Sequence, residues 1–307
     1  MNKYLPEGYL ISTPENREYT SSLLGLEKAM QCGKILEAPA VLCDGELNVT
    51  VDLYGIKGII PKNEMLYTEG DTKDIAIITR IGKPVCFKVI GFNDDGTGKK
   101  TAILSRRSAQ AECMQNFVMS LIPGDIIDAK VTHLERFGAF VDIGCGLISL
   151  LAIDSISVSR IAHPKDRLNV GMCLKTVVKS IDYESGRVYV SQKELLGTWE
   201  ENANEFKIGQ TVAGTIRSIE EYGVFIELAP NLTGLAEARE GLTVGQNAAV
   251  YIKNIIPDRM KIKLVIIDVS KKEQAPREPK YYIENREHID SWVYSPKCCQ
   301  RVIESIF

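Results

Sequence analysis

Two phenylalanines, Phe137 and Phe140, flank Gly138 and Ala139 in a stretch that otherwise alternates apolar and polar residues. A ring exposed on a strand can stack on a nucleic-acid base, and each such contact contributes about 1–3 kcal/mol to the binding of a single strand. Binding also needs cations, because every nucleotide carries a phosphate. Arg187 and Lys130 are candidates for that role.

A carboxylate completes this candidate group. Asp182 could orient Arg187, or accept a hydrogen bond from a base or a 2′-hydroxyl group. Packing in a protein core is the alternative for the rings, because Phe140 and Val141 point to opposite faces of a strand and one of the two must face inward.

The segment around the two rings is repeated. The copies are residues 124–143, GDIIDAKVTHLERFGAFVDI, and residues 209–228, GQTVAGTIRSIEEYGVFIEL. The rings of the second copy are Tyr222 and Phe225, each 85 residues after its counterpart. Both copies run from a glycine through a period-two apolar strand to the aromatic group.

Each copy continues with the pattern of three further strands. These segments are 146–148, 174–181 and 187–191 in one copy, and 234–236, 248–256 and 261–267 in the other. A weaker copy lies upstream, at 51–53, 58–60, 85–89 and 102–105. Five short strands in about 70 residues favour a small closed barrel, since closure leaves no strand edge exposed. The sequence therefore predicts a mainly β protein of three tandem five-stranded barrels, and this second half of the pattern favours stacking over core packing for Phe137 and Phe140.

Short helices are expected between the barrels, where the apolar period changes from two to about four. The spacing predicts helices over 22–32 and 107–121, and another over the stripe from Leu195 to Phe206. The expected parts are an N-terminal helical extension (1–34), a divergent first barrel (35–108), a linker helix (109–123), a second barrel (124–194), a second linker helix (195–208), a third barrel (209–270) and a C-terminal tail (271–307). The aromatic tail is expected to fold back on the third barrel or a neighbouring helix, and to be removable after Lys272 without unfolding a barrel.

The repeated segments resemble a known family. The run G-D-I-I-D-A-K-V-T-H-L-E-R-F-G-A-F-V-D-I-G-C-G-L, the later V-G-M, and S-I-D-Y-E-S-G-R-V-Y-V-S are similar to the S1 RNA-binding domain, an OB-fold barrel first named from a ribosomal protein. The resemblance covers 124–194 strongly, 209–270 clearly and about 35–108 weakly. It implies that RNA lies across the second and third strands of a barrel, against two aromatic residues, a His, an Asp and an Arg.

The second barrel holds most of that set. Its family positions are Phe137, Phe140, Asp182 and Arg187, with Ser149 in place of the His. The third barrel holds Tyr222, Phe225 and Lys261, with Glu237 at the His position and Asp258 as a shifted substitute for the Asp. The first barrel has Leu47, Thr50 and Thr101 at the aromatic and Arg positions, and so has lost the set.

Composition excludes several other classes of protein. The 307 residues include 37 Lys and Arg against 40 Asp and Glu, a net charge of −3, which argues against a strongly basic nucleic-acid coat protein. No window of about 18 residues is free of charge, so we expect no membrane-spanning helix, and the first residues lack the apolar run of a signal peptide. Eight scattered cysteines without C-x-x-C spacing favour free thiols in a reducing cytoplasm.

Signs of catalysis are lacking. The three histidines, His133, His163 and His288, lack acidic or Cys neighbours at metal-ligand spacing, so surface or turn positions are expected rather than a metal site. Residues 93–100 lack the spacing of a phosphate-binding loop and read as a hairpin turn. We therefore expect a protein that is not an enzyme and has neither a cofactor nor a metal.

Two functions fit these observations. The first is an RNA-binding protein of the ribosomal S1-like kind, monomeric and cytoplasmic, that holds single-stranded RNA or mRNA for translation or RNA metabolism, with the ribosome as a candidate partner. The second is a protein–protein adaptor that docks on a ribosome or an enzyme and contacts RNA little. Residues 195–270 hold 7 Lys and Arg against 10 Asp and Glu, which favours adaptor behaviour for the third barrel.

Overall fold

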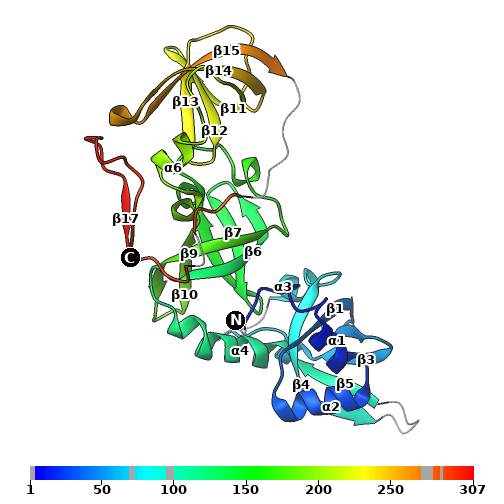
Figure 1. Ribbon diagram of the computed structural model, residues 1–307. Helices are drawn as coiled ribbons and strands as arrows, with labels where there is room; N and C mark the ends of the chain where they lie inside the picture. Colours follow the sequence, from blue (N-terminus) through cyan, green and yellow to red (C-terminus); the bar gives the residue numbers. More distant parts are fainter. Residues whose placement is uncertain (1–3, 69–72, 95–99, 271–278, 284–285) are drawn as a thin grey trace. The chain divides into compact units, whose positions relative to one another are not determined.

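The computed structural model describes residues 4–68, 73–94, 100–270, 279–283 and 286–307 (Figure 1). They form two compact units. The first unit consists of Met1–Leu121, Asp128–Lys130 and Asp142–Ile148, and the second of Ile122–Ile127, Val131–Val141 and Ser149–Phe307. Among the described residues, no helix is long and apolar enough to cross a membrane.

Three closed five-stranded barrels make up most of the chain (Figure 1), which confirms the predicted fold class. The first consists of β1 (Leu36–Cys43), β2 (Val49–Leu53), β3 (Ile56–Ile60), β4 (Pro84–Asp94) and β5 (Lys100–Ser105). The second consists of β6 (Ile126–Glu135), β7 (Gly138–Gly144), β8 (Leu147–Ala152), β9 (Cys173–Asp182) and β10 (Arg187–Ser191). The third consists of β11 (Thr211–Glu220), β12 (Gly223–Ala229), β13 (Leu232–Ala236), β14 (Asn247–Ile256) and β15 (Lys261–Ser270).

All three barrels have one topology. In each, the first three strands follow one another round the barrel, and the fifth strand lies between the third and the fourth. The third and fifth strands pair in parallel in every copy. Most of the hairpin turn expected at 93–100 lies outside the described residues, and the two strands on either side of it pair in antiparallel fashion.

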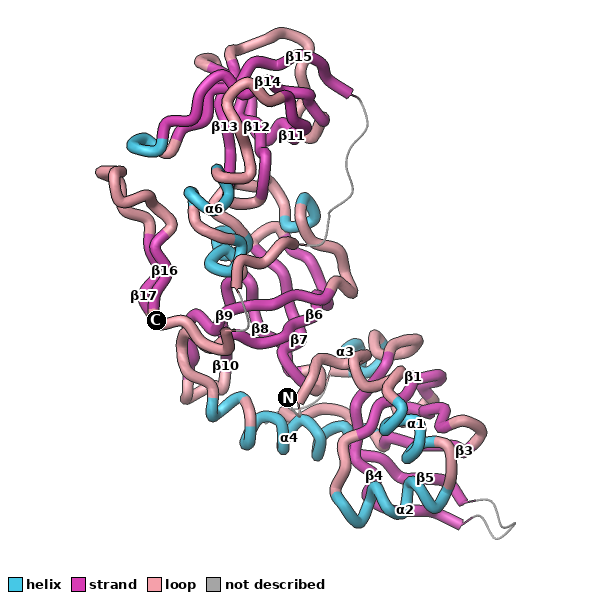
Figure 2. Tube along the Cα trace, in the orientation of Figure 1, coloured by secondary structure: helices cyan, strands magenta, loops and turns pink. Residues whose placement is uncertain are grey.

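Short helices precede the first barrel and connect the later strands (Figure 2). They are α1 (Pro14–Thr20), α2 (Leu23–Cys32), α3 (Asp74–Ile78), α4 (Arg106–Asn116), α5 (Ile153–Ile156) and α6 (Trp199–Ala203), with single 3-10 turns at Lys62–Glu64, Val118–Ser120, Pro164–Asp166, Lys193–Leu196 and Pro257–Arg259. The helix expected at 22–32 is present as α2, with the side chain of Ser22 accepting a hydrogen bond from the backbone N–H of Gly25.

The two linkers are less helical than predicted. Helix α4 ends at Asn116, because Phe117 leaves the helical conformation with φ −126°. The prediction of a single second linker helix over 195–208 is wrong. Gly197 has φ +84° and ends the 3-10 turn before it, and Thr198 then caps a new helix, α6. A glycine in this conformation interrupts a helix whatever the apolar spacing around it.

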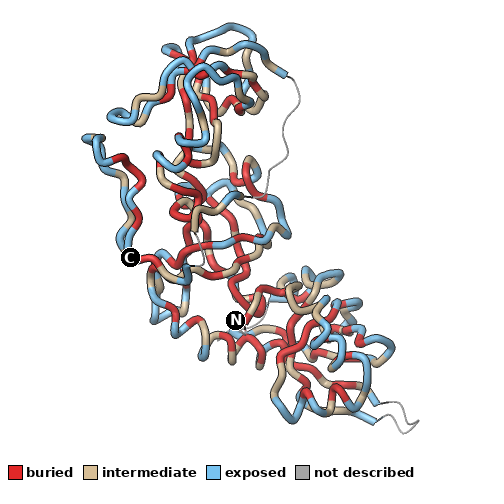
Figure 3. The backbone as a smooth tube through the Cα atoms, in the orientation of Figure 1, coloured by how far each residue is buried: buried red, intermediate tan, exposed pale blue. Residues whose placement is uncertain are grey.

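Burial follows the strands (Figure 3), with alternate residues facing the inside of each barrel. The core of the third barrel extends to the C-terminal tail, where β16 (Ser291–Val293) pairs with β17 (Glu304–Ile306). Trp292 and Tyr294 are buried in that core. The backbone N–H of Trp199 donates to the Tyr294 carbonyl at 3.0 Å, and the Tyr294 hydroxyl donates to the Asn231 carbonyl at 2.6 Å. The tail therefore contributes to a core, and we do not keep the expectation that it can be removed freely.

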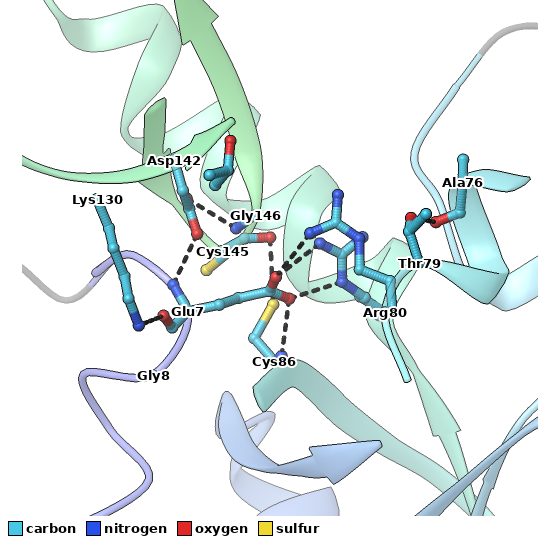
Figure 4. Close-up of polar contacts among 12 residues, drawn as sticks. Glu7, Gly8, Ala76, Thr79, Arg80, Cys86, Lys130, Asp142, Cys145 and Gly146 are labelled. Carbon is cyan, nitrogen blue, oxygen red and sulfur yellow. Dashed lines mark hydrogen bonds and ion pairs between the residues drawn. The ribbon is translucent and has the colours of Figure 1, made fainter. Parts of the chain in front are cut away.

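The first unit contains a buried group of charges that the sequence did not indicate (Figure 4). Arg106 donates from Nε and Nη2 to the two carboxylate oxygens of Glu7, at 2.6 and 3.0 Å, and Arg80 lies 3.6 Å from the same carboxylate. The backbone N–H of Glu7 donates to Asp142 at 2.7 Å, and Lys130 Nζ donates to the Glu7 carbonyl at 2.8 Å. These contacts fasten the N-terminal segment.

Burial and charge shift the pKa values of these acids. Burial alone would raise the pKa of Glu7, but the Arg106 guanidinium, with Arg80, holds it below the ordinary value. Burial, followed by the charge of Glu7, raises the pKa of Asp142 to about 7. The same two causes raise the pKa of Glu37 to about 7.

Glu37 holds the N-terminal segment with one oxygen. Its Oε2 accepts the backbone N–H groups of Gly8, Leu10 and Ile11, each at 3.0 Å. Its Oε1 is buried and has no hydrogen-bond partner among the residues that the structure describes. A proton on Oε1 therefore costs none of the three hydrogen bonds, which suits the neutral form.

We expect Glu37→Gln to flatten the pH dependence of stability. The folded protein keeps the Glu37 proton up to about pH 7, whereas the unfolded chain loses it near 4.5. Wild type therefore loses stability as the pH rises through this window. Between pH 4.5 and 8, the free energy of unfolding of the amide variant should rise relative to that of wild type by as much as ~3 kcal/mol. Urea unfolding at several pH values measures this, with exposed Glu18→Gln as the control. A difference that stays constant with pH would contradict the assignment.

We also expect removal of residues 279–307 to destabilise the third barrel. The truncation takes Trp292 and Tyr294 from its core, and loss of a buried large aromatic side chain costs about 3–5 kcal/mol. Thermal unfolding followed by circular dichroism tests this, and Trp292→Ala should reproduce much of the loss. The control is Val302→Ala, at an exposed position of the same tail. A truncated protein as stable as wild type would show that the tail packs only loosely.

Candidate nucleic-acid interface

The rings of the second barrel face outward. Phe137, in the turn before β7, is 55% exposed, and Phe140 on β7 is half-buried. Their centroids are 6.0 Å apart and their planes are perpendicular, at 89°. Ala139 and Val141 occupy the inward positions on either side of Phe140 and are fully buried. Val141, and not Phe140, is thus the core residue of this pair.

Gly138, between the two rings, marks a close approach of β7 and β8. A Cβ atom at this glycine would lie 2.5 Å from the Leu151 carbonyl oxygen on β8, so no larger residue fits. Beside it, the backbone N–H of Ile153 donates to the Phe137 carbonyl at 2.9 Å. The backbone of β8 thus lies directly against the backbone of Gly138. The aromatic side chains on either side of this glycine lie on the outer surface of the barrel.

The third barrel repeats the arrangement. Tyr222 is 71% exposed, and its ring lies 6.0 Å from that of Phe225 at 87°. Gly223 takes the place of Gly138, and a Cβ atom there would lie 2.6 Å from the Ala236 carbonyl oxygen. The same backbone constraint therefore presents two rings in the same geometry.

Asp182 and Arg187 lie opposite each other on β9 and β10, and both are exposed. The Asp182 carboxylate accepts hydrogen bonds from the hydroxyl and backbone N–H of Ser185 and from the backbone N–H of Glu184. These bonds, the Ser185 hydroxyl foremost, hold the pKa of Asp182 below its usual value. Asp182 is thus an ionised residue that organises the turn beside Arg187. Lys261, at the Arg187 position of the third barrel, is also exposed.

Two residues predicted for the interface are engaged elsewhere. Ser149 is 2% exposed, and its hydroxyl donates to the Val188 carbonyl at 2.6 Å. Lys130 donates to the carbonyl of Glu7 within the first unit. A buried hydroxyl does not suit contact with RNA, and Lys130 is held at the N-terminal segment, so the proposed interface includes neither residue.

Two rings that the sequence analysis did not assign lie on the same surface. His133 on β6 stacks on Phe140, with centroids 6.3 Å apart and planes at 24°. Tyr189 on β10 is exposed and alternates with the buried Val188 and Val190. The period-two pattern of β10 could have revealed Tyr189, since it shares a face with Arg187 two residues earlier.

The other histidines make local contacts. The His163 ring accepts from the backbone N–H of Lys165, and His288 lies 2.8 Å from an oxygen of Asp125. Within the described part of the chain, no group of three or more His, Cys, Asp or Glu side chains could hold a metal ion.

Comparison with known proteins adds to this geometry. The model of the S1 RNA binding domain matches residues 120–193. The chain is 30% identical over 257 residues to the small ribosomal subunit protein bS1 homologue of Bacillus subtilis, which covers 81% of this chain and 63% of that protein. It is 26% identical over 226 residues to bS1 of Rhizobium meliloti (72% of this chain, 38% of that protein) and 28% identical over 301 residues to bS1 of Staphylococcus aureus (91% and 74%).

The chain thus spans 63% and 38% of the Bacillus and Rhizobium proteins, and nearly three quarters of the Staphylococcus protein. The matched domain, residues 120–193, contains the second barrel and all the outward rings described for it. The match to this domain, together with similarity to bacterial bS1 proteins over most of the chain's length, supports an S1-like family.

Proposed function

We propose that this protein binds single-stranded RNA on the outer face of the second barrel, in translation or RNA metabolism. The observation that carries the proposal is the pair Phe137 and Phe140, which lie outward with fixed perpendicular planes in the barrel that matches the S1 RNA binding domain. Bases of any kind can stack on such rings. Arg187, exposed on the same barrel, supplies a cation for phosphate.

The third barrel is a second, weaker candidate site. Tyr222 and Phe225 reproduce the paired rings, and Lys261 supplies a cation. This region is net acidic, which weakens attraction of the phosphate backbone. The first barrel has no aromatic residue at these positions and is not part of the proposed site.

The names of the relatives extend the proposal to a partner. The Bacillus, Rhizobium and Staphylococcus proteins are small ribosomal subunit proteins or a homologue of one. We propose mRNA as the RNA, the ribosome as a partner, and a monomeric, cytoplasmic protein without catalytic activity. The adaptor is not favoured, because the second barrel matches the S1 RNA binding domain and presents two outward rings on which bases can stack.

We expect the double variant Phe137→Ala, Phe140→Ala to lose at least tenfold in RNA affinity, because each lost base stack costs about 1–3 kcal/mol. Fluorescence anisotropy with a labelled oligo-U measures this. Folding should persist, since Phe137 is largely exposed and Phe140 faces outward. The matched control is Tyr222→Ala, Phe225→Ala in the third barrel, where we expect a smaller loss. A double variant that melts cooperatively and binds like wild type would place the RNA elsewhere.

We expect binding to depend modestly on salt and weakly on sequence. If the site neutralises about three phosphates, the slope of log affinity against log salt is about −2. Arg187→Gln should reduce the magnitude of that slope by about 0.7 and lower affinity for oligo-U and oligo-A alike. A slope much steeper than −3 would reveal a basic surface beyond this one, and strong preference for one homopolymer would indicate readout of base edges.

A further inference from the structure

We propose that the RNA site of the second barrel has four rings, with His133 and Tyr189 as its two ends, and that each of these end rings stacks on a base. This inference rests on the proposed function and adds two binding residues to it. It also sets the number of bases that one barrel holds.

His133 is placed to receive a base. Its ring lies nearly parallel to that of Phe140, at 24°, with centroids 6.3 Å apart, and so covers one face of Phe140. A base approaching from the β6 side therefore meets the imidazole first and the phenyl ring only behind it. The His133 side chain is 62% exposed, which leaves the ring accessible to solvent on the side away from Phe140.

Glu135 fixes the orientation of this ring. One carboxylate oxygen lies 2.7 Å from Nε2 of His133, two residues earlier on the same strand. A hydrogen bond to one ring nitrogen limits rotation of the imidazole, so the stacked arrangement is held before RNA arrives. Preorganised rings lose less side-chain entropy on binding than freely rotating ones.

Tyr189 occupies the other end of the row. It pairs with Leu150 on β8, and the hydrogen bond from Ile153 to Phe137 places Leu150 opposite Phe140 when the antiparallel pairing is continued. Directly paired residues of neighbouring strands share a face of the sheet. Tyr189 therefore lies on the same outer face as Phe140, two strands away, roughly 10 Å at the usual strand spacing.

The third barrel shows what a shorter row looks like. There Phe225 pairs with Leu235 and Leu235 with Lys263, so a lysine takes the place of Tyr189. Ser218 pairs with Phe225 from the neighbouring strand, at the position equivalent to His133. The third barrel thus has the central pair of rings without either end. Residues at these two positions distinguish the barrels while the fold stays the same.

The test replaces each end ring separately. His133→Ser introduces the residue that the third barrel carries at this position, and Tyr189→Leu introduces an apolar side chain opposite Leu150, so both variants should fold. We expect each to weaken binding of an oligo-U long enough to cross the barrel by about 5- to 150-fold, the equivalent of one lost stack. Affinity for a two-nucleotide probe, which the central rings alone can hold, should change less than threefold.

Further variants separate stacking from charge. His133→Phe and Tyr189→Phe keep a ring and should retain affinity within about threefold, whereas His133→Lys supplies a cation without a ring and should not. If His133→Lys binds well and His133→Phe does not, the role is electrostatic and the proposal fails. If both end variants bind like wild type while Phe137→Ala, Phe140→Ala loses binding, the site has two rings, and the proposed function stands without this extension. If every one of these variants binds RNA like wild type, the proposed function itself is wrong.

Discussion

The close approach of two strands at a glycine governs the candidate interface. At Gly138 and Gly223 the neighbouring strand passes so near that a Cβ atom would meet its carbonyl oxygen at 2.5 and 2.6 Å. A glycine inside a strand often marks such a close approach of another backbone, and no side chain fits there. The rings beside these glycines lie on the outer surface: Phe137 and Phe140 in the second barrel, Tyr222 and Phe225 in the third. The two barrels therefore present ring pairs with nearly identical separation and angle, although most of their other residues differ.

A second constraint acts in the first unit, where a buried group of charges lies beside the apolar core. The carboxylate of Glu7 is buried and is held by Arg106, with Arg80 nearby. Breaking such a pair would leave an uncompensated charge in the interior, which is strongly destabilising. The N-terminal segment is tied down by these contacts and by the three N–H groups on Glu37. Lys130 and Asp142 take part in this arrangement by hydrogen bonding to the backbone of Glu7.

The three barrels differ in the residues they display and not in topology. The first has no aromatic residue at the family positions, the third has two rings in an acidic region, and the second has four rings with Arg187. A barrel core tolerates these changes because outward residues contribute little to closure. Repetition of one fold thus gives a series of surfaces that differ in the number of outward rings.

The sequence by itself determined the barrels, because the period-two alternation, the repeated glycines and the offset of 85 residues are local and survive without tertiary information. Alternation alone left open whether Phe140 or Val141 faces inward, and the second half of the repeated pattern favoured an outward Phe137 and Phe140. The sequence did not determine the contacts of Ser149, Lys130, His133 or the tail. Each of them depends on a partner far along the chain or on another strand. Ser149 bonds Val188, Lys130 bonds Glu7, and Tyr294 bonds Asn231. Whether a polar side chain binds a ligand or another part of the protein depends on which groups the fold brings to it, and only the tertiary structure decides that.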